Sequence, residues 1–282
     1  MTPEPTPDLA PLIARLAKRE DQHKYAHGHA VILSGGPGEG GAARLAARGA
    51  LRVGAGLVTL GCPLPALAEN AARMDTVMLR PVHDGRALAR MLEDRRYNAL
   101  CLGPGMGFER ARDLVPVAAC SGRGVVVDAD ALSAYAPDPA ELFALCTPAV
   151  VLTPHGGEFR RLFPDLAPCV AADPDEVLRQ AAARAGAVVL LKGARTVIAA
   201  PDGALAVSDA TGARAAPWLA TAGSGDVLAG IITGLIARGF PAFEAAQLGT
   251  WLHVEAARAF GPGLIAGDLP ETLPGVFRKL GL

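Results

Sequence analysis

The stretch TAGSGDVLAG, residues 221–230, carries the residue types that bind and transfer phosphate. Small residues at 223–225 precede Asp226, and the apolar run 227–237 follows at once. Glycines let a loop turn its N–H groups towards one point, and the first turn of a helix adds unpaired donors and the positive end of the helix dipole. The pattern therefore predicts an anion-binding loop that leads into a buried helix.

Asp226 is the unexpected member of this loop, because a carboxylate repels an anion. Phosphoryl transfer needs donors for the phosphate oxygens and a group that takes the proton of the attacking hydroxyl, and Asp226 fits the second role. Its place at a helix N-terminus predicts a lowered pKa and a weak base in the ground state. The alternative is a first-turn acid that only stabilises the helix. The sequence has no Walker A motif, which argues against an ordinary P-loop enzyme.

Other residues that could contact a ligand follow short apolar runs, which we predict to be strands. They are GPGMG at 103–107, Asp128 with Asp130, His155 with Glu158 in TPHGGEF, and the segment from Lys192 to Thr196. Open α/β sheets bind ligands at the carboxyl ends of parallel strands, so these residues are candidates for one site. Structural roles stay open for them: a tight turn for the glycines, a helix cap for the aspartates and a packed histidine.

A glycine loop at 34–41 matches the dinucleotide pattern GxGxxG through Gly36, Gly38 and Gly41. The pattern requires an acidic residue at the end of the next strand, and that strand ends in LGCP. We therefore interpret the loop as a ligand-facing or tight-turn loop rather than as an NAD cofactor site. His23 and His27 have the spacing of two metal ligands, but no acidic partner accompanies them, and we predict no metal-ligating residues.

The elements that position these residues alternate between strand and helix. Strands are predicted at 30–33, 57–60, 99–102, 125–127, 149–152 and 187–191, and a hairpin pairs 197–200 with 204–207. Helices are predicted at 9–19, 41–53, 66–73, 86–94, 174–185, 227–237 and 243–260, with one more near the end of the chain. This alternation predicts an α/β fold in which helices cover both faces of a mainly parallel sheet. The polar segment 208–220 could cover the site.

Length and composition agree with a globular enzyme. The chain has 282 residues, a net charge of −1 and 5% aromatic residues, so nucleic-acid binding has little support. Five cysteines without a CxxC pair indicate reduced thiols, and the start lacks the pattern of a signal peptide. No apolar run is long enough to span a bilayer. We expect a soluble, cytoplasmic protein with no membrane partner, with a disordered tail at 1–7 and a single domain at 8–282.

Eight motifs together resemble one enzyme family. The sequence GSGD before an apolar helix is similar to the ribokinase-like superfamily, although Ala220 stands where the usual DTxGAGD has its first aspartate. A fuller resemblance, over about residues 22–275, is to the ADP-dependent (S)-NAD(P)H-hydrate dehydratases. It is carried by HKYAHGHAVILSGG, GAARLAARGALRVGAGLVTL, LGPGMG, VVDADAL, LTPHGGEF, LLKGARTVIAAPDG, ATAGSGDVLAG and GLIAGDLPETLP.

The resemblance implies a ribokinase-like three-layer sandwich and a repair reaction. ADP, or ATP in some relatives, with Mg²⁺ would phosphorylate the added hydroxyl of the S form of hydrated NADH or NADPH. Elimination of phosphate would then return NADH or NADPH, and AMP would be released. The resemblance further implies a homotetramer. Relatives are often fused to an N-terminal epimerase domain, for which this chain has no room.

The resemblance also assigns residues. Asp226 would be the catalytic base, with an anion hole formed by Gly223, Ser224 and Gly225. The adenine nucleotide would contact Lys192, Gly193, Ala194, Arg195, Thr196 and Gly225. The hydrated dinucleotide would contact Ala42, Gly107, His155 and Asp226.

Three departures from the family pattern stand out. Tyr25 replaces the glycine of HKG, and Gly156 replaces the proline of TPHPGEF. The segment that usually reads like NxTGNxGLAT is longer here, which leaves open how the segment 209–220 contacts a nucleotide.

Three other functions compete with the repair reaction. A kinase of the same fold, acting on a small alcohol such as a vitamin precursor, would keep Asp226 but release a stable phosphate ester. A non-catalytic nucleotide-binding protein would tolerate the loss of that carboxylate. A dehydrogenase would transfer hydride without ADP, and the missing ribose-binding acid argues against it.

Overall fold

The computed structural model describes residues 8–282, so the predicted tail at 1–7 lies outside the described part. A nine-stranded sheet runs through it in the order β3-β2-β1-β4-β5-β6-β7-β8-β9. The strands are parallel from β3 to β7, and β8 and β9 are antiparallel to their neighbours. This arrangement confirms the mainly parallel sheet expected from the alternating pattern.

The strand bounds lie close to the predicted ones, with one addition. The strands are β1 (His29–Leu33), β2 (Leu57–Cys62), β3 (Met78–Pro81), β4 (Ala99–Leu102), β5 (Gly124–Val127), β6 (Val150–Leu152), β7 (Val188–Leu191), β8 (Arg195–Ala199) and β9 (Leu205–Asp209). The sequence did not predict β3, a short edge strand whose residues are mostly exposed, so it lacks the apolar signal of a buried strand. The predicted hairpin is confirmed as β8 and β9.

The helices also follow the predicted order, but the sequence did not predict a twelve-residue helix at 108–119 or two five-residue helices at 129–133 and 139–143. They are α1 (Ala10–Ala14), α2 (Gly41–Arg52), α3 (Leu67–Ala71), α4 (Gly85–Met91), α5 (Phe108–Ala119), α6 (Ala129–Ser133), α7 (Pro139–Phe143), α8 (Gly156–Leu162), α9 (Pro174–Ala185), α10 (Ser224–Ala237), α11 (Ala242–Phe260) and α12 (Asp268–Lys279). The helix expected at 9–19 is shorter than predicted: it ends at Ala14, before the charged run that starts at Lys18.

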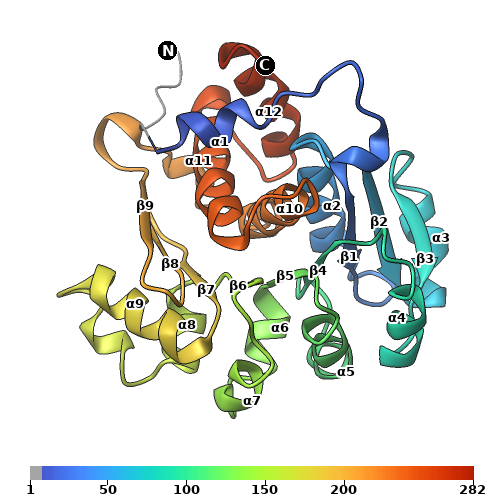
Figure 1. Ribbon diagram of the computed structural model, residues 1–282, viewed down its shortest axis with the longest axis horizontal. Coiled ribbons are helices and arrows are strands. Elements are labelled where there is room, and N and C mark those ends of the chain that lie inside the picture. Colours follow the sequence, from blue (N-terminus) through green and yellow to red (C-terminus); the bar gives the residue numbers. More distant parts are fainter. Residues whose placement is uncertain (1–7) are drawn as a thin grey trace.

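The helices form one layer on each face of the sheet (Figure 1). One layer contains α2, α10, α11 and α12, which share a buried apolar cluster with one face of the strands. The other contains α4 to α9, which pack against the opposite face in a second cluster. The structure is thus the three-layer α/β sandwich that the sequence predicts.

Helix α10 lies against the middle of the sheet and contacts α2 at backbone distance. A Cβ atom added to Gly230 would lie 2.0 Å from the carbonyl oxygen of Ala46, and one added to Gly234 would lie 2.7 Å from that of Ala50. These two glycines, one turn apart on α10, therefore allow the two helices to approach closely. Every α10 residue from Val227 to Ala237 is buried, so only the first turn of the helix can face a ligand.

The predicted site residues follow β4, β5, β6 and β7 directly, so they lie along the carboxyl edge of the sheet. The first turn of α10 lies at the same edge, since Gly225 approaches Lys192, the residue after β7. Within residues 8–282, no helix is both long and apolar enough to cross a membrane.

Candidate functional site

The glycine loop before α10 has a shape that other residues could not adopt. Gly223 is the N-cap of the helix with φ 89°, and a Cβ on it would lie 2.7 Å from Cδ1 of Leu45. The Ser224 hydroxyl donates to the carbonyl of Leu219 at 2.8 Å, and Nε2 of His253 donates to the Ser224 carbonyl at 2.9 Å. These contacts fix the loop. The Ser224 N–H donates to the Thr221 carbonyl at 3.3 Å, so in the first turn of α10 the N–H groups of Gly225 and Asp226 remain for an anion.

Asp226 lies in the first turn of α10, and its pKa is raised from 3.8 to about 7. Burial is the largest cause, followed by the charge of Asp128, while Lys192 acts in the opposite direction. The prediction of a lowered pKa is therefore wrong, because desolvation and nearby carboxylates outweigh the helix dipole. A carboxyl that titrates near neutral pH is a better base than one with an ordinary pKa.

Lys192 lies between Asp128 and the start of α10. Its Nζ donates to Oδ1 of Asp128 at 2.6 Å, and a Cβ built on Gly225 would lie 3.3 Å from the same nitrogen. The Asp128 side chain is 1% exposed. Burial lowers the pKa of Lys192, but the carboxylates around it raise it further, so its net pKa is raised and the ammonium stays charged. A fixed positive charge thus lies beside the anion loop.

The rest of the KGART segment contributes less to this centre. Thr196 turns its hydroxyl back to the carbonyl of Gly193 at 2.9 Å. The Arg195 guanidinium is paired with Asp175 of α9 at 2.9 Å. The Ala194 carbonyl accepts from the N–H of Ala210, which joins the segment to the end of β9. Among these residues, Lys192 alone brings a charged side chain to Asp128 and Gly225.

His155 has both a structural role and an exposed face. Its Nδ1 accepts from the N–H of Gly157 at 2.9 Å and of Glu158 at 3.3 Å, and the Glu158 carboxylate accepts from the His155 N–H at 2.8 Å. This is a capping box at the start of α8. Since Nδ1 accepts, the proton of the neutral ring lies on Nε2, and the side chain is 56% exposed. The backbone of His155 pairs with that of Lys192, which places the ring near the site.

Ala129 has the single positive φ among the non-glycine residues of the described chain, at 45°. Such a conformation costs about 1–3 kcal/mol and persists where the surroundings impose it. Ala129 separates Asp128, which binds Lys192, from Asp130, whose Oδ2 accepts from the N–H of Gly107 at 3.0 Å. The strained residue thus lies between two carboxylates that make contacts with two different parts of the carboxyl edge of the sheet. The sequence DAD suggested ligand contact or a cap and did not reveal this arrangement.

The two other predicted substrate contacts lie close together. A Cβ built on Gly105, two residues before Gly107, would lie 2.6 Å from the Glu39 carbonyl and 3.5 Å from Cβ of Ala42. The GPGMG loop therefore packs on the glycine loop at 34–41. In that loop, the N–H groups of Gly36 and Gly38 donate to the carboxylates of Glu39 and Glu69. Both donors are thus occupied, unlike those of a pyrophosphate-binding loop.

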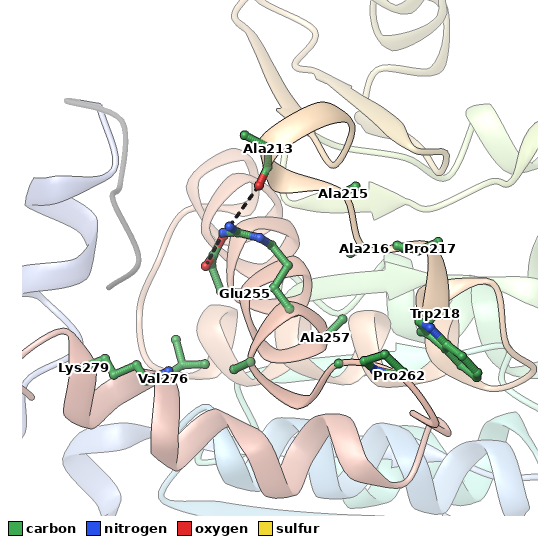
Figure 2. A pocket seen from close by; sticks show the side chains of 13 residues that line it. Ala213, Ala215, Ala216, Pro217, Trp218, Glu255, Ala257, Pro262, Val276 and Lys279 are labelled. Atoms are coloured by element: carbon green, nitrogen blue, oxygen red, sulfur yellow. Dashed lines mark hydrogen bonds and ion pairs between the residues drawn. The ribbon is translucent and has the colours of Figure 1, made fainter. Parts of the chain in front are cut away.

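The polar segment before α10 lines a pocket of about 480 Å³ with the ends of α11 and α12 (Figure 2). Trp218 stands at one side of it and Lys279 at the other, and Arg258 bridges the carboxylate of Glu255 and the carbonyl of Ala213. Leu219 follows Trp218 in the chain, and its carbonyl accepts from the Ser224 hydroxyl, so the segment that lines this pocket is hydrogen-bonded to the loop before α10. The sequence predicted a cover for the site, but an exposed tryptophan in an irregular segment gave no signal for a pocket wall.

Metal-ligating groups were not predicted, and residues 8–282 contain no cluster of three or more His, Cys, Asp and Glu residues that could hold a metal ion. His27 is buried, and His23 packs its ring edge-on to the ring of Tyr25.

Comparison with known proteins shows a family match over most of the chain. Residues 30–273 match a family model described as NAD(P)H-hydrate dehydratase. The chain is 41% identical to a bifunctional NAD(P)H-hydrate repair enzyme of Moorella thermoacetica, over 95% of this chain and 52% of that protein. It is 37% identical to an ADP-dependent (S)-NAD(P)H-hydrate dehydratase of Neisseria meningitidis serogroup B, over 90% of this chain and 86% of that protein.

The chain spans about half the length of the first curated relatives it matches. Among solved structures, it is similar to an ADP/ATP-dependent NAD(P)H-hydrate dehydratase of Bacillus subtilis that was co-crystallised with ATP and Mg²⁺. The TM-score is 0.76 at 26% identity, over 93% of each chain. The similarity in fold confirms the ribokinase-like α/β sandwich expected from the sequence.

Proposed function

The chain belongs to the NAD(P)H-hydrate dehydratase family, and from this membership we propose that it dehydrates the S form of hydrated NADH or NADPH in a reaction that consumes ADP. The ring hydroxyl would be phosphorylated and then lost as phosphate, which returns NADH or NADPH and releases AMP. The observation that carries the proposal is a buried carboxyl with a pKa of about 7, that of Asp226, at a helix N-terminus beside the charged Lys192.

Asp226 would take the proton of the ring hydroxyl as the bond to phosphorus forms. A carboxylate of ordinary pKa is too weak a base for this task, whereas a pKa of about 7 brings it close to neutral pH. Phosphorylation matters because hydroxide is a poor leaving group and phosphate is a good one. The electrons of the ring nitrogen can then expel the phosphate, and the cation so formed would return the reduced nicotinamide by losing a proton from the neighbouring ring carbon to the departing phosphate or to solvent.

The phosphate groups of ADP would lie against the loop 223–225 and the first turn of α10, where N–H groups lack helical partners. The ammonium of Lys192 adjoins Gly225, so it can balance the charge that moves onto the phosphate oxygens. The base of the nucleotide would extend towards Trp218, since the segment that carries this exposed side chain is hydrogen-bonded to Ser224 through Leu219. Aromatic side chains bind bases by stacking.

Mg²⁺ is the cofactor that the family resemblance implies, and the carboxylates at this edge fit it. Mg²⁺ keeps several waters and is usually bound by one or two carboxylates together with substrate phosphates, so it does not need a protein cage of three ligands. Asp128, Asp130 and Glu158 lie close enough to Asp226 to raise its pKa. The ion, when bound, would neutralise charge on the phosphates.

The hydrated dinucleotide would occupy the side of the edge formed by Ala42, Gly107 and His155. The loop before Gly107 packs on the loop that leads to Ala42, so one ligand can contact both. His155 keeps Nδ1 in its helix cap. Its Nε2 lies 3.6 Å from Oε1 of Glu158 on a ring that is largely exposed, so it could donate to an oxygen of the ligand.

The test is recovery of NADH from its hydrate in the presence of ADP, followed by the absorbance of the reduced nicotinamide. The wild-type chain should restore NADH, and Asp226→Asn should lose about 10²–10⁴-fold in turnover while it still binds the nucleotide. Asp75→Asn, a change at an exposed aspartate, is the matched control. No recovery by the wild-type chain would contradict the proposal, and a stable phosphate ester of a small alcohol would indicate a kinase instead.

Three further properties remain predictions: the use of ADP rather than ATP, the tetrameric assembly and the cytoplasmic location. The first is tested by comparing the two nucleotides in the same assay, and the second by light scattering of the purified chain.

A further inference from the structure

Three buried polar atoms in the described part of the chain have no hydrogen-bond partner. They are Oγ of Ser208, Nε of Arg214 and Nε1 of Trp251. Buried polar groups are almost always paired, so an orphaned group points to a partner that is a water or an ion. These three atoms therefore need a hydrogen-bond partner that the protein itself does not supply.

All three residues line one small cavity of about 20 Å³. Ser208 comes from β9, Arg214 from the segment between β9 and α10, and Trp251 from α11. The lining is completed by apolar Leu9, Ile198 and Val207 and by Gln247. Because all three residues line the same cavity, a single guest can serve their unpaired atoms, and a volume of about 10–15 Å³ is enough for one water molecule.

The chemistry of the three atoms defines what the guest must do. The N–H groups of Trp251 and Arg214 can only donate, so the guest must accept at least two hydrogen bonds. The Ser208 hydroxyl can accept one in return. A water molecule meets all three demands, with Gln247 as a further polar neighbour.

A halide ion would also accept from these donors, and the one carboxylate of Glu255 is shared by Arg214 and Arg258, but the apolar part of the lining does not favour an anion. The Arg214 guanidinium is already paired with the buried carboxylate of Glu255 at 3.0 Å. Three of the seven lining residues are aliphatic, and they give an anion no compensation for lost hydration.

We propose that one buried water molecule occupies this cavity, accepts from Trp251 and Arg214, and donates to Ser208. The water joins an edge strand, the lengthened segment 209–220 and α11 at one point. It holds Arg214 at Nε while Glu255 holds the same guanidinium at Nη2. Since Glu255 and Arg258 also line the pocket of Figure 2, the water helps to fix the wall of that pocket. This site does not depend on the proposed reaction.

A high-resolution crystal structure of the full chain, grown without chloride, tests the site directly. One density peak should lie within hydrogen-bond distance of all three atoms, and a bromide soak should leave it without anomalous signal. An anomalous peak would assign the site to a halide and overturn the water. An empty cavity, or side chains that pair with one another in it, would overturn the proposal as well.

Two substitutions at Ser208 give an independent test in solution. Ser208→Ala leaves room for the water, whereas Ser208→Val fills the cavity, displaces the water and leaves both N–H donors unpaired. We therefore expect a lower denaturation midpoint for Ser208→Val than for Ser208→Ala, although valine is the better strand residue. If the cavity is empty, valine fills a void and the order reverses. An equal or higher midpoint for Ser208→Val would thus contradict the water site.

Discussion

The raised pKa of Asp226 makes a prediction about stability that is separate from catalysis. The folded-state pKa of about 7 lies above the ordinary value of 3.8, so the folded protein binds this proton more tightly than the unfolded chain does. The stability from this group is fully present below about pH 4 and is lost as pH rises through 7. A difference of roughly three pKa units corresponds to about 4 kcal/mol of unfolding free energy.

Asp226→Asn removes the charge and keeps the shape of the side chain. At about pH 8 the wild-type chain carries a buried, poorly compensated carboxylate, and the variant does not, so the variant should be the more stable protein. At about pH 5 the folded wild-type chain is protonated at this position, and the advantage of the variant should be smaller by about 3 kcal/mol.

Urea denaturation at the two pH values measures both effects, with Asp75→Asn as a control for the loss of one negative charge at an exposed position. The control should show the same small effect at both pH values. If the advantage of Asp226→Asn is no larger at high pH than at low pH, then burial does not hold the pKa of Asp226 near neutral. The inference that this carboxyl is a tuned base would then fail.

Three further changes test the surroundings of Asp226. Asp128→Asn should move the acidic limb of the pH–rate profile to lower pH. After burial, the charge of Asp128 is the largest cause of the raised pKa of Asp226, so its removal should lower that pKa. An unmoved limb would contradict this coupling. Gly223→Ala should reduce the free energy of unfolding by about 1–3 kcal/mol, measured by denaturation, since φ is 89° and the new methyl group meets Leu45. Trp218→Ala should weaken ADP binding roughly tenfold in calorimetry through the loss of stacking, and an unchanged affinity would place the base elsewhere.

The sequence predicted the parts of the site that depend on local pattern. The glycine loop before Asp226, the buried α10 and the place of Lys192 at the end of a strand all follow from residue types within a few positions. The contact between Lys192 and Asp128 does not, because these residues lie 64 positions apart and meet only where the sheet brings the ends of β5 and β7 to one edge.

The prediction of a lowered pKa for Asp226 was wrong because it, too, rested on local sequence alone. Its position in the first turn of a helix is visible in the sequence and lowers a pKa, whereas its burial and the nearby carboxylates arise only from tertiary packing. The pocket beside Trp218 also escaped prediction, since its wall is an irregular segment whose path depends on contacts with α11.

The contact between α10 and α2 limits how the protein can close on a ligand. Because Gly230 and Gly234 bring the two backbones together, neither helix can slide or rotate without a clash of main-chain atoms. The pair acts as one rigid block that carries Asp226 at its tip, and a hinge within it would break the packing. The place of Asp226 on the sheet is therefore set by the packing of these two helices, and a ligand has to be brought to a carboxyl that stays where it is.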